Sequence, residues 1–233
     1  NGTLSNKEMK NLIVVAHPDD EVLGFGGAGY SCVKAGEIVK ALILCGSADA
    51  RSQHPSNQQL LHDTNKANSL LGFEGPILGD FPNICMNTVK HLDMVQFIEA
   101  EIQDFKPDRI FTHHPADLND DHKQVANACM AASRLFQRQQ SEEILKSLFF
   151  MEILSSTDWA FTAGSPLFMP NVFVDITNSI EKKLEALSCY RNVMRPAPHP
   201  RSLNVLKGHS SYRGGQCGCL YAESFQLTYS LGL

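Results

Sequence analysis

One short segment constrains the fold of this chain more than any other. The run Asn11–Ala16 is apolar after its first residue, without the alternation of a half-exposed strand. Such a run indicates a strand buried on both faces of a parallel sheet. It ends abruptly in His17–Glu21, which holds one imidazole and three carboxylates. Because α/β folds bind ligands at the carboxyl ends of such strands, these polar residues mark a candidate site.

The residue types in this segment suit a metal centre. His17 and Asp20 are three residues apart, so both can point at one position if the turn leads into a helix. Imidazole nitrogen and carboxylate oxygen are ligands for zinc and ferrous iron, and a third ligand leaves one position for water. Asp19 lies between the two ligands and should point elsewhere, which leaves it available to transfer a proton.

A second strand end repeats this design. The apolar segment Arg109–Thr112 leads into a cluster of histidines and aspartates and then into a helical segment. Within the cluster we favour His122 as the third ligand, because the helix would hold it rigidly. His113 and His114 remain alternatives on chemistry alone. His114 and Asp121 could also orient a ligand through a hydrogen bond, as is common around metal-bound imidazoles.

Several motifs resemble one family. The string AHPDDE at 16–21, the glycine-rich segment at 23–29 and NDDH at 119–122 resemble the PIG-L or LmbE-like family of metal-dependent N-deacetylases. The closing RGG at 213–215 and YAESF at 221–225 extend the resemblance over most of the chain. The resemblance implies metal ligation by His17, Asp20 and His122, and it implies that Asp19 is the general base.

The chain departs from the family at one position. Many members carry a histidine three residues before the last ligand, where this sequence has Asn119. Any role of that histidine in stabilising the oxyanion would pass to Asn119, His114 or His209. Two loop arginines are further candidates for binding substrate: Arg51, after the second strand, and Arg201, in a proline-rich loop. A guanidinium suits a substrate hydroxyl or phosphate.

Strand and helix signals alternate through the first part of the chain. Residues 10–140 predict strands at 11–16, 38–45, 76–79 and 109–112, and helices at 22–35, 58–71, 90–105 and 122–140. The less regular part, 141–233, predicts strands at 147–154 and 171–176, a helix at 180–190 and a pocket-forming loop at 195–202. We therefore expect a single α/β domain over 1–233, with a doubly wound, mostly parallel, Rossmann-like sheet.

Two other interpretations of the segment 17–29, nucleotide binding and helix capping, are weaker. Gly24–Gly29 fits G-x-G-x-x-G, and Asp49 could bind a ribose, but a dinucleotide fingerprint follows its strand directly. Here acidic residues intervene and would repel phosphate, so the glycines favour close packing of helix on sheet. The aspartates could instead cap a helix. Capping does not explain His17 or the matching cluster at His122.

Composition restricts the partners. A net charge of −5 without a block of basic residues argues against nucleic acid. Seven scattered cysteines are typical of reduced thiols and indicate the cytoplasm. The amino end lacks the apolar core of a signal peptide, and no run reaches the roughly 18 apolar residues of a transmembrane helix. The sequence does not fix the oligomeric state and is compatible with a homo-oligomer.

The expected reaction is removal of an N-acetyl group from a small amino sugar of the GlcNAc type. A divalent metal, Zn²⁺ or alternatively Fe²⁺, would activate water, and Asp19 would take the proton and hand it to the departing amine. Two alternatives remain at this point: a divalent-metal-binding protein without catalytic activity, and a nucleotide-binding enzyme of the doubly wound type.

Overall fold

The computed structural model describes residues 8–49, 55–139, 144–161 and 166–232. The elements in chain order are β1 (Lys10–Val15), α1 (Asp20–Lys34), β2 (Ile38–Ile43), α2 (Asn57–Leu71), β3 (Ile77–Leu78), η1 (Met86–Thr88), α3 (His91–Phe105), β4 (Arg109–His113), α4 (Asp120–Ala132), α5 (Leu135–Gln139), β5 (Ser147–Met151), β6 (Val172–Asp175), α6 (Ile180–Leu187), α7 (Leu203–Cys217) and β7 (Ala222–Ser230).

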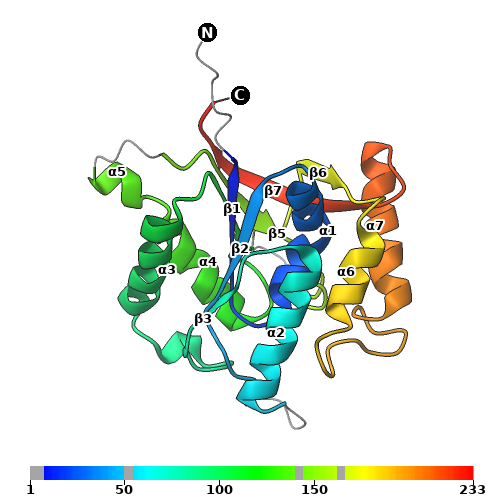
Figure 1. Ribbon diagram of the computed structural model, residues 1–233, viewed down its shortest axis with the longest axis horizontal. Helices are drawn as coiled ribbons and strands as arrows, with labels where there is room; N and C mark the ends of the chain where they lie inside the picture. Colours follow the sequence, from blue (N-terminus) through cyan, green and yellow to red (C-terminus); the bar gives the residue numbers. More distant parts are fainter. Residues whose placement is uncertain (1–7, 50–54, 140–143, 162–165, 233) are drawn as a thin grey trace.

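The strands form one seven-stranded sheet in the order β3-β2-β1-β4-β5-β7-β6. Pairing is parallel from β3 through β5, whereas β7 runs antiparallel to both of its neighbours. Helices α3, α4 and α5 lie on one side of the sheet and α1, α2, α6 and α7 on the other (Figure 1). The predicted α/β class with a mostly parallel, doubly wound sheet is confirmed.

Strand β1 supplies both cores at once. Ile13 and Val15 belong to the cluster that includes side chains of α1, α2 and α6, whereas Leu12 and Val14 belong to the cluster with α3 and α4. All four side chains are fully buried. Successive strand residues point to opposite faces, so burial of a central strand requires an unbroken apolar run. This geometry explains why the first strand could be predicted from sequence.

The glycines of α1 allow the helix to approach its neighbours closely. A Cβ on Gly24 would lie 2.7 Å from Ile153 Cδ1, and one on Gly27 would lie 2.9 Å from Ile176 Cγ2. A side chain at either position would force these neighbouring isoleucines to shift. Gly24–Gly29 therefore sits inside a packed helix, and the packing interpretation is favoured over nucleotide binding.

A buried ion pair is hydrogen-bonded to the backbone of α1. Glu223, on β7, accepts hydrogen bonds from the Gly27 and Ala28 N–H groups at 2.9 and 2.8 Å. Lys183, on α6, donates to the Leu23 carbonyl and to Glu223, both at 2.7 Å. Both charged side chains are buried. The helix that begins at Asp20 is thus joined to two elements from the far end of the chain.

The structure corrects several predicted elements. The helix expected at 122–140 is two helices, α4 and α5, and the helix at 180–190 ends at Leu187. Helix α7 and strand β7 were not predicted. Only Leu206, Ser210 and Gly214 of α7 are buried, so this helix has no continuous apolar stripe to reveal it.

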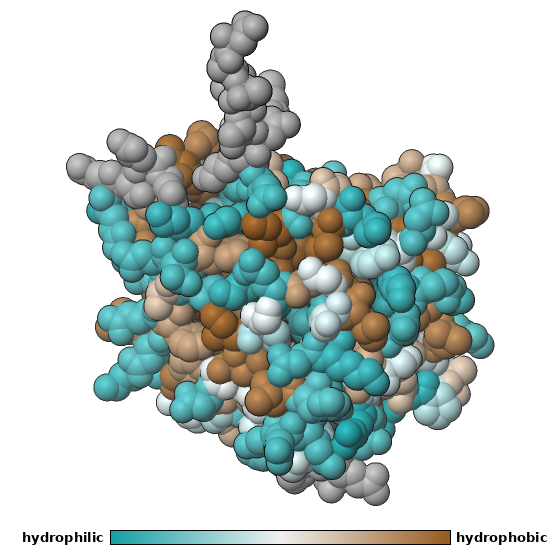
Figure 2. All heavy atoms as spheres, viewed as in Figure 1, coloured by the Kyte–Doolittle hydropathy of each residue, from teal (hydrophilic) through white to brown (hydrophobic). Residues whose placement is uncertain are grey.

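The outside of the molecule carries mixed side chains, and polar and apolar residues are interspersed over the face seen in Figure 2. None of the helices in the described ranges has the length and apolar character that crossing a membrane would require. The seven cysteines are all free thiols, with Cys45 and Cys129 buried and Cys85 and Cys217 exposed.

Candidate metal centre and active site

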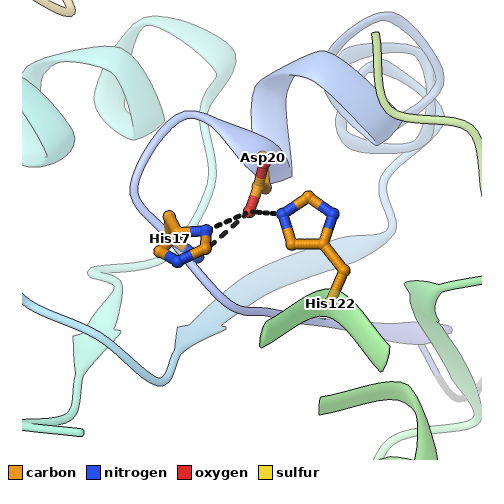
Figure 3. A group of neighbouring side chains, drawn as sticks. All are labelled: His17, Asp20 and His122. Carbon is orange, nitrogen blue, oxygen red and sulfur yellow. Dashed lines mark hydrogen bonds and ion pairs between the residues drawn. The ribbon is translucent and has the colours of Figure 1, made fainter. Parts of the chain in front are cut away.

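The two predicted clusters meet at one edge of the sheet. Strands β1 and β4 pair directly and in parallel, so their carboxyl ends lie side by side. His17 follows β1, Asp20 is the first residue of α1, and His122 lies in the first turn of α4. Their side chains converge, with both imidazoles directed at one oxygen of Asp20 (Figure 3).

The spacing of these donor atoms suits a divalent cation. Asp20 Oδ2 lies 3.3 Å from His17 Nδ1 and 3.2 Å from His122 Nε2. Ligands bound tetrahedrally about 2.0–2.1 Å from zinc lie about 3.3 Å apart. The exposed fractions are 8% for His17 and 1% for the other two residues. This buried group of two histidines and one carboxylate can therefore hold a metal ion.

Each imidazole has a carboxylate beside its outer nitrogen. His17 Nε2 lies 2.9 Å from Asp121 Oδ2, and His122 Nδ1 lies 3.3 Å from Asp117 Oδ2. Carboxylates in this position fix the orientation of metal-binding imidazoles and raise their basicity. Asp121 was expected in such a role. Asp117 was missed, because nothing in the sequence separates it from the other acids of its cluster.

Hydrogen bonds from other segments fix both outer carboxylates. Asp121 accepts from the backbone N–H groups of Ile84 and Met86, at 2.6 and 2.9 Å. Asp117 accepts from the hydroxyl of Thr157 at 2.8 Å and also from that of Ser156. The loop before α3 and the segment after β5 thus hold the carboxylates that orient the two imidazoles.

The charges of these side chains shift one another's pKa values. Burial alone would lower the pKa of His122, but Asp20 and Asp117 outweigh it and raise that pKa to about 10. Burial opposes ionisation of Asp20, yet His122 and His17 hold the pKa of this carboxyl well below its ordinary value. Without metal, His122 therefore carries a proton at neutral pH, and its positive charge compensates the neighbouring carboxylates.

His113 and His114, the alternatives for the third ligand, have other surroundings. His113 Nε2 accepts a hydrogen bond from the Ala16 N–H at 2.8 Å, and burial together with the charge of His122 lowers its pKa to about 3. His113, Asp117 and His122 form a second group with metal-ligand spacing. However, neither His113 nor Asp117 lines the cavity that opens beside the first group, so the geometry favours His122 together with His17 and Asp20.

Asp19 has an unusual backbone conformation. Its φ is 105°, in the left-handed region, and its side chain makes no capping hydrogen bond to α1. The Asp19 N–H donates to Glu21 Oε2 at 3.0 Å. On its other side, Arg201 Nη1 lies 3.3 Å from Asp19 Oδ2, and Arg201 Nε donates to the Leu154 carbonyl at 3.0 Å. The capping alternative therefore does not account for Asp19, which instead lines the cavity.

Glu21 has a structural role next to Asp19. Its other oxygen, Oε1, accepts from Asn68 Nδ2 at 3.0 Å and from the Tyr190 hydroxyl. Burial raises the pKa of Glu21 to about 7, against the hydrogen bond from Tyr190. Because both oxygens of Glu21 accept hydrogen bonds, one of them from the Asp19 N–H, this side chain fixes the turn at Asp19.

A cavity of about 300 Å³ opens at the centre, near the lower end of the roughly 300–1,000 Å³ range of small-molecule sites. Its polar wall contains the candidate ligands and base, and its apolar wall comes from other segments. The lining includes His17, Asp19, Asp20, His122, Asn119, Arg201, Ala48, Leu60 and Ile84.

The candidate substrate residues have different positions. Asn119 and Arg201 line the cavity, Arg201 beside Asp19. Asn119 Oδ1 accepts the Asp121 N–H at 3.0 Å and caps α4, so its amide nitrogen is the donor that can face a ligand. Arg51 lies outside the described residues.

Two histidines proposed to replace the family histidine lie elsewhere. His114 packs edge-on against Phe150 and Phe168, with ring centres 5.4 and 5.8 Å away, and does not line the cavity. His209 belongs to α7, and its Nε2 lies 3.1 Å from Glu152 Oε2. Of the three candidates, only Asn119 is in place to contact a ligand.

Fold and site together define an α/β protein with a candidate metal centre of two histidines and one carboxylate. Comparison with known families identifies the family within this class. Residues 12–133, more than half of the chain, match the PIG-L family, described as GlcNAc-PI de-N-acetylase. The chain belongs to this family. No curated protein sequence matches it significantly.

Solved structures share the fold at low identity. The conserved protein TT1542 from Thermus thermophilus is 22% identical over 97% of both chains, with a TM-score of 0.78. GalB, the 4-carboxy-2-hydroxymuconate hydratase from Pseudomonas putida, is 18% identical over 97% of this chain and 98% of its own, with the same TM-score. N,N'-diacetylchitobiose deacetylase from Pyrococcus horikoshii is 18% identical over 97% and 87%, with a TM-score of 0.72.

Proposed function

We propose that this protein is a metal-dependent N-deacetylase that releases acetate from an N-acetylated amino sugar of the GlcNAc type. The observation that carries the proposal is Asp19. It is a carboxylate in the cavity wall, next to the candidate ligands His17, Asp20 and His122, and it does not cap the helix. Membership of a de-N-acetylase family and structural neighbours described as deacetylases support the same reaction.

We assign the metal position to His17, Asp20 and His122, with zinc as the expected ion and ferrous iron as the alternative. A divalent cation bound there supplies Lewis acidity for the acyl carbonyl and lowers the pKa of water in its coordination sphere. Asp121 and Asp117 hold the two imidazoles in the required orientation.

The remaining chemistry belongs to side chains of the cavity wall. Asp19 takes a proton from the water that attacks the acyl carbon and returns it to the amine nitrogen as the C–N bond breaks. The second transfer is necessary because an unprotonated amine is a poor leaving group. Arg201 keeps the Asp19 carboxylate in place, and the Asn119 amide nitrogen is the proposed donor to the acyl oxygen.

The test combines metal analysis with a substrate panel. Freshly purified protein should contain about one equivalent of a divalent metal and release acetate from at least one N-acetyl amino sugar. A chelator should stop release, and added zinc or ferrous iron should restore it. If the protein binds metal but releases acetate from no substrate, the alternative function is favoured, a metal-binding protein without catalytic activity.

The panel also needs a substrate for water addition to a double bond, because one structural neighbour is a hydratase. Turnover of that compound without acetate release would replace the deacetylase proposal. We further propose that residues 1–233 form one deacetylase domain and that the protein is cytoplasmic, in keeping with its seven free thiols.

A further inference from the structure

Ile84 has a backbone conformation that its side chain disfavours. Its φ is 58°, in the left-handed region, where a β-branched residue is a rare outlier. The Ile84 N–H donates to Asp121 Oδ2 at 2.6 Å, and the Met86 N–H donates to Asp121 Oδ1 at 2.9 Å. The carboxylate that orients His17 therefore also holds this corner of the loop in place.

The Ile84 side chain also has an unfavourable environment in the free protein. It is 55% exposed although it is apolar, and it lines the candidate active-site cavity. Leu60 and Ala48 line the same cavity and are buried. Together the three residues form an apolar wall of the cavity, of which only Ile84 is exposed to solvent. The candidate metal ligands, in contrast, are buried.

Backbone strain and an exposed apolar side chain both lower stability, and strained residues concentrate where ligands bind. We propose that Ile84 is a specificity-determining residue that packs against an apolar group of the substrate outside the reacting amide, such as an alkyl group on the sugar. This inference rests on the proposed function. The contact lies outside the amide because the amide must reach the buried ligands while Ile84 remains at the open side.

The experiment compares N-acetylglucosamine with its butyl glycoside as substrates of metal-loaded protein. Ile84→Asn and Ile84→Gly both tolerate a left-handed backbone and remove the apolar side chain. We expect each to lower the ratio of kcat/KM for the glycoside over the free sugar about tenfold, the low end for an apolar contact. Relief of strain should raise Tm by about 2–4 °C, with metal content unchanged.

Lys106→Gly is the matched control. Lys106 also has a positive φ, 57°, but it follows α3 and does not line the cavity. Its substitution should raise Tm in the same way and leave the substrate ratio as in the wild type. A change in the ratio of this control would mean that stability alone sets the ratio, and would overturn the assignment of Ile84.

Binding separates failure of this inference from failure of the proposed function. Calorimetry gives Kd for both sugars with wild type and variants. If both sugars bind but release no acetate, the proposed function fails, and a Kd for the butyl glycoside that rises relative to the Kd for the free sugar in the Ile84 variants still supports the contact. A ratio equal in wild type and variants, or no binding of either sugar, overturns the inference.

Discussion

At Asp19 and Asp20, two identical side chains in consecutive positions have different environments because their backbones differ. The left-handed φ of 105° at Asp19 turns its carboxylate towards Arg201, while Asp20 begins α1 and faces two imidazoles. Aspartate tolerates this conformation better than most residues. The backbone conformation thus separates a candidate proton carrier from a candidate metal ligand.

The first prediction concerns Asp19→Asn. This substitution keeps the size of the side chain but removes its ability to accept a proton, so acetate release should fall at least about a hundredfold. Element analysis should find the metal content of the wild type. Asp120→Asn, on the exposed first turn of α4, serves as the control and should retain activity. Near-normal turnover of Asp19→Asn would remove Asp19 from the mechanism.

The second prediction concerns the proton on His122. Against the effect of burial, Asp20 and Asp117 raise its pKa to about 10, so at pH 7 an incoming metal ion must displace that proton. Metal affinity should therefore rise with pH up to about 10, by about tenfold per pH unit for each proton released. Calorimetry in buffers with different ionisation enthalpies measures the release, and a heat independent of buffer would contradict it.

At the scale of elements, the candidate centre depends on how α1 is held. Its first residue is a proposed ligand, and backbone groups of its Leu23–Ala28 segment form hydrogen bonds to Lys183 and Glu223. Removing one partner of such a buried pair leaves the other charge buried without an opposite charge beside it.

We therefore predict that Lys183→Met lowers the free energy of unfolding by about 3–5 kcal/mol. Urea unfolding at neutral pH measures the change. Lys182→Met on the same helix is the control, because Lys182 pairs with Glu185 on the surface at 2.7 Å, and it should leave stability unchanged. Equal stability of the two variants would show that the buried pair contributes nothing.

The sequence predicted those elements whose signal is local. The buried run before His17 and the strand before the cluster at His122 both had such a signal, and parallel pairing placed their ends together. Helix α7 had none, because most of its residues are polar and only Leu206, Ser210 and Gly214 are buried. The contact of Arg201 with Asp19 and the strained corner at Ile84 arise from tertiary packing between distant segments, which no pattern in one sequence specifies.

At the scale of the whole molecule, a bound cation would join segments that are far apart in the chain. His17 follows β1 and Asp20 begins α1, whereas His122 lies in α4, about a hundred residues further along the chain. A ligand that binds only the folded state stabilises it by mass action. The metal should therefore act as a link across the sheet edge.

We predict that zinc at a hundred times its Kd raises the free energy of unfolding by about 2.7 kcal/mol, and that a chelator reverses the gain. Thermal unfolding with and without metal measures it. Asp20→Asn removes a proposed ligand and should abolish the dependence on metal. A dependence that survives in this variant would place the bound ion elsewhere, for example at the group of His113, Asp117 and His122.

The bonds from Glu223 to the backbone of α1 have a consequence for biosynthesis. A nascent chain exposes all three proposed ligands once residue 122 has left the ribosome, but the carboxylate that receives the Gly27 and Ala28 N–H groups is translated much later. Until β7 docks, the helix that begins at Asp20 lacks this anchor. A cation captured during translation would therefore be held loosely, and tight loading would follow release of the finished polypeptide.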